Sequence, residues 1–453
     1  MDSITNSMTL IENNFCNTMK IGIIGLGFVG LSFASVLGSK KYSVIGVDSD
    51  SQKVNKILTG KAPFYEPKLD NTLENALKNG LKITNEINQV VTECKLIFIA
   101  VGTPQRKDGS IDLTMIKKVV KEIGKNLAKT KNIPIIIVKS TVVPETTTKI
   151  ILPILEKESR KKVGKGFGLI TNPEFLRETN AINDTINPHV VVIGGYNDKF
   201  TKEIENFYTK FHKNIPIINT NHQTSEMVKY ANNSFLATKI SFINQIATIC
   251  EAISEVNVDT VATTIGLDPR IGSLFLTAGP GYGGSCLPKD VKAIINFSNK
   301  YKIKPALLHA VEEINQQQLE NIINTIKKKV GKINNKKITI LGLAFKDNTD
   351  DIRDSISIKL IDLLLKKGAK IIAHDSKAIF NTKIIFGEKI QYTNSIKEAM
   401  KNTECAIIMT TAKEYSQINN NELKLMKKRL IIDSRRLLVN RNLDVDYSAI
   451  GMG

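Results

Sequence analysis

The stretch Lys20-Ile21-Gly22-Ile23-Ile24-Gly25-Leu26-Gly27-Phe28-Val29-Gly30 decides the fold of the first part of the chain. A short apolar run leads into Gly25, Gly27 and Gly30, and a helical pattern follows. Strand, glycine turn and helix in this order are typical of a dinucleotide-binding unit. The first glycine permits the tight turn, the second lets a pyrophosphate approach the helix N-terminus, and the third lets the helix lie close to the strand.

The next apolar run, residues 43–47, ends at Asp48. A carboxylate at this place accepts hydrogen bonds from the adenosine ribose and repels a 2′-phosphate, which predicts NAD rather than NADP. Two further runs, 96–101 and 134–138, lead to Thr103 and Thr141. Ligands gather at the carboxyl ends of parallel strands, so we expect both threonines to face the cofactor. A cap of a helix or turn is the alternative for either residue alone.

The pattern is helical over residues 224–256, and Lys229 and Asn233 share one face there because they are four residues apart. That face of the helix is either exposed to solvent or part of the active site. After a lysine-rich connector, strand-like runs return and end near Asp375. We predict an α/β protein with two Rossmann-like doubly wound domains joined by a central helical region. The expected parts are a polar extension (1–19), an NAD-binding domain (20–218), the central helical region with the Cys286 loop (219–325) and a second nucleotide-binding domain (326–453).

Composition limits the class of protein. The chain has 453 residues, enough for two or three domains, and 42% hydrophobic residues, as in a globular protein. Its five cysteines are scattered, odd in number and without a CxxC pair, which argues against a disulfide framework and favours a reducing cytoplasm. The five histidines are equally dispersed, so we expect no metal site.

The formal net charge of +19 would permit nucleic-acid binding. The lysines are spread along the whole chain without a recognisable nucleic-acid module, so we expect no nucleic-acid partner and only steering of an anionic substrate. Residues 21–39 carry no charge, but their glycines argue against a membrane helix, so we expect no membrane association. Both Met1 and Met19 are candidates for the natural start.

A second informative stretch is Gly279-Pro280-Gly281-Tyr282-Gly283-Gly284-Ser285-Cys286-Leu287-Pro288-Lys289-Asp290. The glycines let the backbone approach a ligand closely. Lys289 can stabilise a thiolate, and Asp290 can handle a proton. The alternative is a loop with a buried, unreactive cysteine.

Taken together, seven motifs resemble the nucleotide-sugar 6-dehydrogenase family over nearly the whole chain after residue 19. Their order along the chain matches the order in that family. They are Gly25 to Gly30 with Asp48, Gly102-Thr103-Pro104, Ser140-Thr141, Asn172-Pro173-Glu174-Phe175-Leu176-Arg177-Glu178, Lys229 with Asn233, the Cys286 loop, and Gly342-Leu343-Ala344-Phe345-Lys346 with Asp351-Ile352-Arg353-Asp354-Ser355.

The resemblance implies oxidation of the sugar C6 alcohol to a carboxylate by two NAD molecules, through a thiohemiacetal and then a thioester on a cysteine. By the same resemblance Cys286 is the nucleophile, Lys229 and Asn233 stabilise oxyanions, and Asp290 and Thr141 position or activate water. Glu174 is then a general acid or base. Which carboxylate moves which proton stays open.

The resemblance also implies binding residues. The cofactor set is Gly25, Gly27, Val29, Gly30, Asp48, Lys53, Thr103, Thr141, Glu178, Lys289 and Arg353. The substrate set is Glu174, Phe175, Leu176, Arg177, Glu178, Lys229, Asn233, Arg270, Phe275, Leu276, Thr277, Ala278, Gly279, Gly283 and Lys346. For Lys53 and Arg353 ordinary surface charge is the alternative.

The sugar and the assembly are narrower expectations. Ser285 and Lys289 follow the pattern of relatives that act on glucose and GDP-mannose. UDP-glucose, oxidised to UDP-glucuronate, is therefore expected before GDP-mannose or a UDP-N-acetylhexosamine. Arg270 matches an arginine that reaches the neighbouring subunit's sugar in relatives, which implies a homodimer. The resemblance further implies that the central helical region (219–325) is the dimerisation and catalytic-loop region and that residues 326–453 form the nucleotide-sugar-binding domain. A different class of function is an inactive dehydrogenase fold that senses a cofactor or binds nucleic acid.

Overall fold

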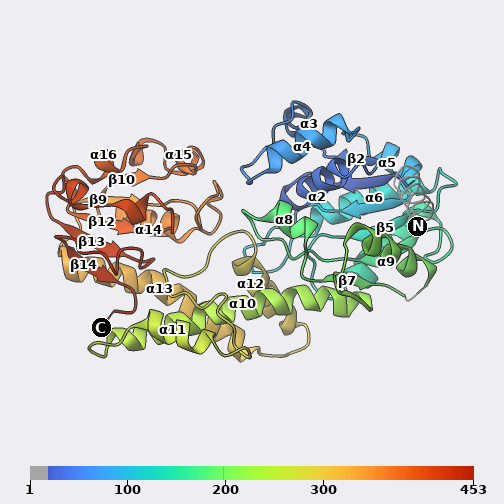
Figure 1. Cartoon of the computed structure of the whole chain (residues 1–453). Helices are drawn as coiled ribbons and strands as arrows, with labels where there is room; N and C mark the ends of the chain where they lie inside the picture. The colour runs from blue at the N-terminus through green and yellow to red at the C-terminus, as the bar shows by residue number, and fades with distance from the viewer. Residues whose placement is uncertain (1–18, 197, 453) are drawn as a thin grey trace, which may run out of the picture. The chain divides into compact units, whose positions relative to one another are not determined.

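The computed structural model describes residues 19–196 and 198–452. The predicted extension 1–19, except for Met19, therefore lies outside the described residues, and so does Cys16. The chain divides into two compact units with their boundary between Ala231 and Asn232. Figure 1 shows the order of the elements along the chain, and each unit is described by itself.

The first unit is built on an eight-stranded sheet with the order β3-β2-β1-β4-β5-β6-β7-β8. All neighbouring strands are parallel except the antiparallel pair β6 and β7. The strands are β1 (Ile21–Ile24), β2 (Val44–Val47), β3 (Lys82–Thr84), β4 (Leu96–Ile99), β5 (Ile135–Val138), β6 (Gly168–Thr171), β7 (Val191–Gly194) and β8 (Ile217–Thr220). The order around β1 reverses direction between β1 and β4, as in a doubly wound fold.

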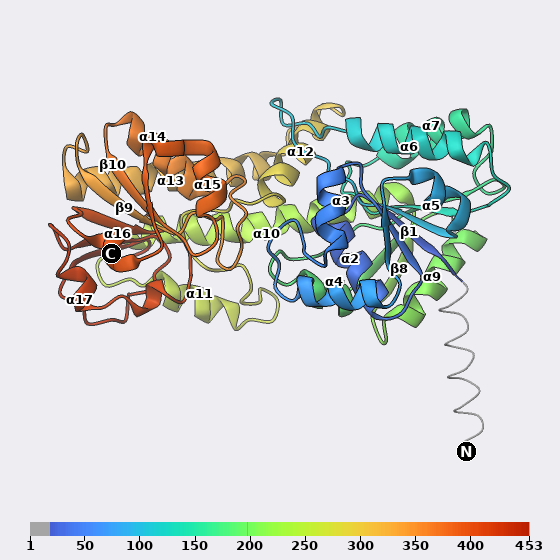
Figure 2. The same ribbon diagram turned by 90° about the horizontal axis from the view of Figure 1, so that it is seen from above.

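Helices cover both faces of this sheet, and Figure 2 shows α2 and α4 on the side opposite to α6 and α7. The helices are α2 (Phe28–Ser39), α3 (Ser51–Leu58), α4 (Leu69–Lys78), α5 (Ile87–Glu93), α6 (Thr114–Leu127), the π-helical turn η1 (Thr147–Ile151), α7 (Leu152–Ser159), α8 (Ala181–Ile186) and α9 (Lys199–Phe211).

The alternation of side chains along each strand explains the two helical layers. On β4, Leu96 and Phe98 pack into one apolar cluster, while Ile97 and Ile99 pack into another. On β5 the residues divide between the same two clusters in the same alternating way. A strand that is buried on both faces needs a continuous apolar run, which is why residues 96–99 and 135–138 carry no polar side chain.

The second unit contains a fully parallel six-stranded sheet with the order β11-β10-β9-β12-β13-β14. Its strands are β9 (Lys337–Leu341), β10 (Lys370–His374), β11 (Gln391–Thr393), β12 (Cys405–Ile408), β13 (Leu430–Asp433) and β14 (Asp446–Ala449). On β12, Cys405 and Ile407 face one apolar cluster and Ala406 and Ile408 face the other. The local pattern of the first unit therefore recurs here.

The helices of the second unit include those of the central region. They are α11 (Val258–Gly266), α12 (Leu287–Asn299), α13 (Ala306–Val330), α14 (Ile356–Lys366), α15 (Ile379–Phe386), η2 (Gly387–Lys389), α16 (Ile396–Met400), η3 (Tyr415–Gln417) and α17 (Asn420–Leu423). The long helix α10 (His222–Glu251) contains the boundary between the units. The predicted α/β class, with two Rossmann-like sheets and a helical middle, is confirmed.

Among residues 19–196 and 198–452, no helix has the length and apolar character needed to cross a bilayer. Residues 21–39, which lack charge, form β1 and α2 instead of one continuous helix.

Candidate active site

The glycine turn after β1 has the geometry of a dinucleotide cradle. Gly25 has a φ of +96°, and a Cβ there would lie 2.8 Å from the Val101 nitrogen. Gly27 is the N-cap of α2, and a Cβ there would meet no atom within 4 Å, so this side is open for a ligand. A Cβ on Gly30 would lie 1.8 Å from the Gly25 oxygen. The three glycines thus serve the turn, the open approach and the close packing of the helix.

Asp48 lies at the carboxyl end of β2, beside this turn. Its Oδ2 accepts hydrogen bonds from the Leu26 nitrogen and from Lys53 Nζ, each at 2.9 Å. Burial alone would raise the Asp48 pKa, but the bonds from Lys53 and from the Asp50 and Leu26 nitrogens outweigh it and hold the pKa below its usual value. Lys53 therefore supports the charged Asp48 directly.

A cavity of about 450 Å³ connects these groups. Gly25, Gly27, Asp48 and Lys53 line it, and further lining residues include Val101 and Met115. The residues present fit NAD, because an open helix N-terminus suits a pyrophosphate and an ionised carboxylate suits a ribose.

The other predicted cofactor residues of the first unit, Val29, Thr103, Thr141 and Glu178, are not among the residues that line this cavity. Val29 lies in the first turn of α2 and is half-buried. The Thr103 hydroxyl donates a 2.8 Å hydrogen bond to the Thr141 carbonyl, so it ties the ends of β4 and β5 together. Glu178 is half-buried in the segment that follows β6.

Glu174 and Lys229 form a buried ion pair within the first unit. Glu174 Oε1 lies 3.1 Å from Lys229 Nζ, and the side chains are only 8% and 5% exposed. Glu174 Oε2 accepts from the Leu176 nitrogen, and Lys229 Nζ lies 5.3 Å from the centre of the Phe175 ring. Lys229 thus reaches the predicted substrate segment from α10. A paired, buried ammonium and carboxylate can stabilise an oxyanion and exchange a proton.

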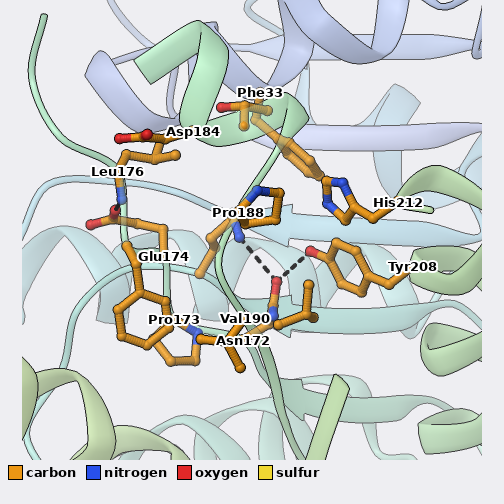
Figure 3. A pocket seen from close by; sticks show the side chains of 14 residues that line it. Phe33, Asn172, Pro173, Glu174, Leu176, Asp184, Pro188, Val190, Tyr208 and His212 are labelled. Carbon is orange, nitrogen blue, oxygen red and sulfur yellow. Dashed lines mark hydrogen bonds between the residues drawn. The ribbon is translucent and has the colours of Figure 1, made fainter. Parts of the chain in front are cut away.

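The segment that begins at Asn172 is anchored at both ends. Asn172 Oδ1 accepts hydrogen bonds from Lys139 Nζ and the Tyr208 hydroxyl, and Figure 3 shows Asn172 and Tyr208 turned toward each other. Arg177 binds Asp184 through its Nε and Nη2 atoms, so its guanidinium is already paired inside the unit.

In the second unit, Cys286 is the N-cap of α12, and it is exposed. The other described cysteines, Cys94, Cys250 and Cys405, are buried. The N-terminus of a helix stabilises negative charge, and this position therefore favours a thiolate. Ser285 Oγ lies 3.6 Å from the Cys286 sulfur. The alternative prediction of a buried thiol at residue 286 is wrong.

A polar cluster lies one helical turn from the thiol. Asp290 is 1% exposed, and its Oδ2 accepts a 2.6 Å hydrogen bond from Asn233 Nδ2. Its other oxygen is paired with Lys289 Nζ. The Asp290 nitrogen donates to the Cys286 carbonyl at 2.9 Å, so the helix itself fixes the distance between carboxylate and thiol. Asn233 is therefore buried and not solvent-exposed.

The glycines before Cys286 pack against the last predicted motif. A Cβ on Gly283 would lie 2.5 Å from the Asp354 oxygen, and one on Gly284, whose φ is +87°, would lie 2.7 Å from the Phe345 ring. The Gly284 nitrogen donates to the Arg353 carbonyl at 3.0 Å. Close contacts with other parts of the protein therefore require glycine at both positions. From the sequence, the expected reason for these glycines was the close approach of a ligand.

The remaining predicted residues of the second unit are partly exposed or loop-bound. Arg270 and Arg353 are exposed and bind the neighbouring Asp268 and Asp351. Lys346 Nζ lies 5.7 Å from the Phe345 ring centre. In the segment before the glycines, Phe275 has a φ of +67°, and the Gly279 nitrogen donates to Asn244 Oδ1 at 2.8 Å. Leu276 and Ala278 are buried and Thr277 is exposed.

Some residues around the site were not found from the sequence. Glu66 accepts 2.8 Å hydrogen bonds from the Thr179 and Ala181 nitrogens, so it clamps the segment that follows Glu174. A Cβ on Gly279 would lie 3.2 Å from Arg435 Nη1. The signal for Arg435 was its place just after the apolar run 430–432, at the carboxyl end of a parallel strand. Glu66 carried no comparable signal.

The dinucleotide cradle and the second α/β sheet define the class of protein, an NAD-dependent dehydrogenase. Three family models match the chain in order: the NAD binding domain (residues 19–212), the central domain (223–317) and the UDP binding domain (339–440) of the UDP-glucose/GDP-mannose dehydrogenase family. The chain belongs to this family of nucleotide-sugar 6-dehydrogenases.

Individual relatives are similar over nearly their whole length. A UDP-glucose 6-dehydrogenase of Haloferax volcanii is 37% identical over 95% of this chain and 100% of its own. The structure of a UDP-glucose dehydrogenase from Pyrobaculum islandicum has a TM-score of 0.90 at 30% identity, covering 97% of this chain and 99% of the other. A UDP-D-ManNAc dehydrogenase from Pyrococcus horikoshii has a TM-score of 0.85 at 26% identity, covering 96% and 100%. The predicted enzyme class and NAD binding are confirmed.

Proposed function

We propose that the protein oxidises UDP-glucose to UDP-glucuronate through covalent intermediates on Cys286. The observation that carries the proposal is the exposed Cys286 at the N-terminus of α12. Buried Asn233 and Asp290 and half-buried Lys289 form a cluster one turn away. The other described thiols are buried, and burial raises the pKa of Cys94 to about 12. A thiol with so high a pKa is a poor nucleophile at neutral pH.

The proposed reaction has four steps: oxidation, addition of the thiol, a second oxidation and hydrolysis. The C6 alcohol loses a hydride and a proton and becomes an aldehyde. The Cys286 thiol adds to this aldehyde to give a thiohemiacetal, which loses a second hydride and proton to become a thioester. Water then cleaves the C–S bond and releases the carboxylate and the thiol. NAD, when bound, accepts one hydride in each oxidation, so two NADH form per sugar.

The surrounding residues take separate roles in this proposal. Lys229 stabilises the developing oxyanion with its ammonium group, and Asn233 donates a hydrogen bond. Asp290 and Thr141 position or activate water, and Glu174 serves as general acid or base. Gly25, Gly27, Val29, Gly30, Asp48, Lys53, Thr103, Thr141, Glu178, Lys289 and Arg353 bind NAD. Glu174–Glu178, Arg270, Phe275–Gly279, Gly283 and Lys346 bind the nucleotide sugar together with Lys229 and Asn233.

An assay of NADH formation tests this function and its sugar together. With UDP-glucose we expect about two NADH per sugar consumed. GDP-mannose and the UDP-N-acetylhexosamines complete the panel, because the family name and the similarity to a UDP-D-ManNAc dehydrogenase support them as second candidates. A clear preference for one of these sugars would replace the proposed substrate, and no NADH with any of them would contradict the enzymatic proposal.

The nucleophile is tested with paired cysteine variants. Cys286→Ala should abolish net formation of the carboxylate, because the other thiols in the described part of the chain are buried and cannot carry the thioester. Cys250→Ala removes a buried thiol of the same unit and should leave turnover nearly unchanged. Full turnover in the Cys286→Ala variant would contradict the covalent route. The need for a reduced thiol also supports a cytoplasmic location.

We further infer a homodimer formed along α10. Phe235, Phe242 and Ile249 are exposed and follow one another at seven-residue spacing, so they share one face of this helix. Exposed apolar stripes of this kind support self-association. Phe242→Asp should give a monomer by sedimentation, while Ile384→Asp, at an exposed apolar residue of α15, should not. Sedimentation of the unchanged protein as a monomer would contradict the homodimer.

A further inference from the structure

Lys139 is a buried lysine that none of the proposed steps uses. It follows β5 directly and is only 8% exposed. Its Nζ donates a 3.0 Å hydrogen bond to Asn172 Oδ1 and lies 5.1 Å from the centre of the Phe33 ring. Removing an ammonium group from water costs several kcal/mol unless partners compensate. A charge kept in such a place calls for a specific interaction.

Asn172 is held in one orientation by this contact and three others. Its Oδ1 also accepts from the Tyr208 hydroxyl, and its Nδ2 donates to the Val192 carbonyl at 2.8 Å. Its backbone nitrogen donates to the Val138 carbonyl at 2.9 Å. Figure 3 shows the Oδ1 atom at the meeting point of two hydrogen bonds. Because Asn172 begins the Asn172-Pro173-Glu174 turn, Lys139 fixes the starting point of the segment that carries Glu174.

The charges around Lys139 connect it to the buried ion pair. Burial lowers the Lys139 pKa to about 8, while the Glu174 carboxylate opposes this shift and the Lys229 ammonium adds to it. Glu174 therefore lies in the field of two ammonium groups, of which only Lys229 is its direct ion-pair partner at 3.1 Å.

The other titratable groups that line the same small cavity do not replace Lys139. Burial lowers the His212 pKa to about 4, which leaves its ring neutral at neutral pH. Burial raises the pKa of the Tyr208 hydroxyl, which therefore stays protonated. Asp184 is already paired with Arg177. Among the residues that line this cavity, Lys139 is thus the cation that acts on Glu174, in addition to the ion-pair partner Lys229.

We propose that Lys139 is a positioning residue for Glu174. Its ammonium group fixes the Asn172-Pro173-Glu174 turn through Asn172 and attracts the Glu174 carboxylate. The effect on catalysis rests on the proposed acid–base role of Glu174, whereas the coupling between Lys139 and Glu174 does not.

The coupling is tested first without catalysis. Lys139→Gln keeps a donor for Asn172 and removes the charge, and Glu174→Gln removes the opposite charge. A double-mutant cycle on the melting temperature should be non-additive, because the two charges interact. Lys161→Gln provides the matched control, since Lys161 also donates to an amide oxygen, that of Thr130, at 2.6 Å. The changes in melting temperature caused by Lys161→Gln and by Glu174→Gln should be additive. Additivity of Lys139→Gln with Glu174→Gln would overturn the proposal.

Steady-state kinetics of the variants then test the catalytic consequence. We expect Glu174→Gln to lower kcat by roughly tenfold or more, because an amide cannot exchange a proton. Lys139→Gln, which keeps a donor for Asn172, should lower kcat several-fold and leave KM for UDP-glucose near that of the parent. Lys139→Met, which also loses the hydrogen bond, should raise KM for UDP-glucose several-fold, while NADH affinity stays unchanged as a check on folding.

The outcomes separate the two proposals. If Glu174→Gln keeps the kcat of the parent, the acid–base role of Glu174 is wrong, and the double-mutant cycle still decides the role of Lys139. If Glu174→Gln lowers kcat while Lys139→Gln and Lys139→Met keep both kcat and KM of the parent, the positioning role of Lys139 is overturned.

Discussion

Asn233 donates a 2.6 Å hydrogen bond to Asp290, a carboxylate that is 1% exposed. The bond joins α10 to the first turn of α12, the helix that begins at Cys286. A buried carboxylate needs such partners because desolvation disfavours its charged form. The orientation of the groups next to the thiol therefore depends on a residue 53 positions earlier in the chain.

Removal of this bond should impair both stability and turnover. Asn233→Ala leaves one Asp290 oxygen without its donor, so we expect a loss of about 1–3 kcal/mol in the free energy of unfolding. With a donor lost next to the thiol, kcat should fall by roughly 10²-fold. Denaturant unfolding and NADH assays measure the two effects. Gln245→Ala, at an exposed residue of the same helix, should change neither; an Asn233→Ala enzyme with normal kcat would refute the role of Asn233 in turnover.

Asp48 should decide between the two nicotinamide cofactors. Asp48→Ala removes the carboxylate that suits a ribose diol, and it frees Lys53, which can then meet a 2′-phosphate. We expect the ratio of kcat/KM for NAD to that for NADP to fall by at least about tenfold. Steady-state kinetics with both cofactors measure the ratio. Asp108→Ala, at an exposed carboxylate, should preserve it, and an unchanged ratio in Asp48→Ala would count against the ribose contact.

Glu226 should make the stability of the protein depend on pH. Burial raises the Glu226 pKa to about 7, although the carboxylate accepts a 2.8 Å hydrogen bond from the Thr147 nitrogen. Between its unfolded pKa and about 7, the folded state binds more protons than the unfolded state, so the contribution is fully present below the unfolded pKa and is lost as pH rises through 7. The loss is roughly 3 kcal/mol.

Melting temperatures of the parent and Glu226→Gln from pH 4 to pH 8 measure this effect. The neutral amide keeps the acceptor for Thr147 but does not ionise, so the variant should gain stability relative to the parent as pH rises. Glu122→Gln should follow the parent at every pH. A constant difference between Glu226→Gln and the parent would show that Glu226 does not titrate in this range.

Gly283 should tolerate no side chain. A Cβ there would lie 2.5 Å from the Asp354 carbonyl oxygen, a backbone atom that cannot rotate away. We expect Gly283→Ala to lower the free energy of unfolding by about 1–3 kcal/mol and to reduce kcat, because the loop that carries Cys286 must shift. Calorimetry and NADH assays test this. Ser285→Ala in the same loop serves as the control for stability, and an equally stable Gly283→Ala protein would disprove the packing argument.

The two Rossmann-like folds follow from local features of the sequence. Apolar runs such as 21–24 and 96–99 must be buried on both faces, and the glycines at 25, 27 and 30 each answer a local backbone requirement. The position of Asp48 at the ligand-binding edge could also be predicted, because the residue directly follows an apolar run and the carboxyl ends of parallel strands form that edge. Such features depend on neighbours in sequence and can be recognised from it.

Which distant residues meet depends on how the whole chain packs. The pairing of Glu174 with Lys229, the hold of Glu66 on the segment after Glu174, and the contact of Gly283 with Asp354 each join parts of the chain at least 50 residues apart. No local pattern encodes them, since a buried charge or a missing side chain has meaning only against the groups packed around it. Lys139 is one lysine among many in the sequence, and burial beside Asn172 and near Glu174 gives it a specific place.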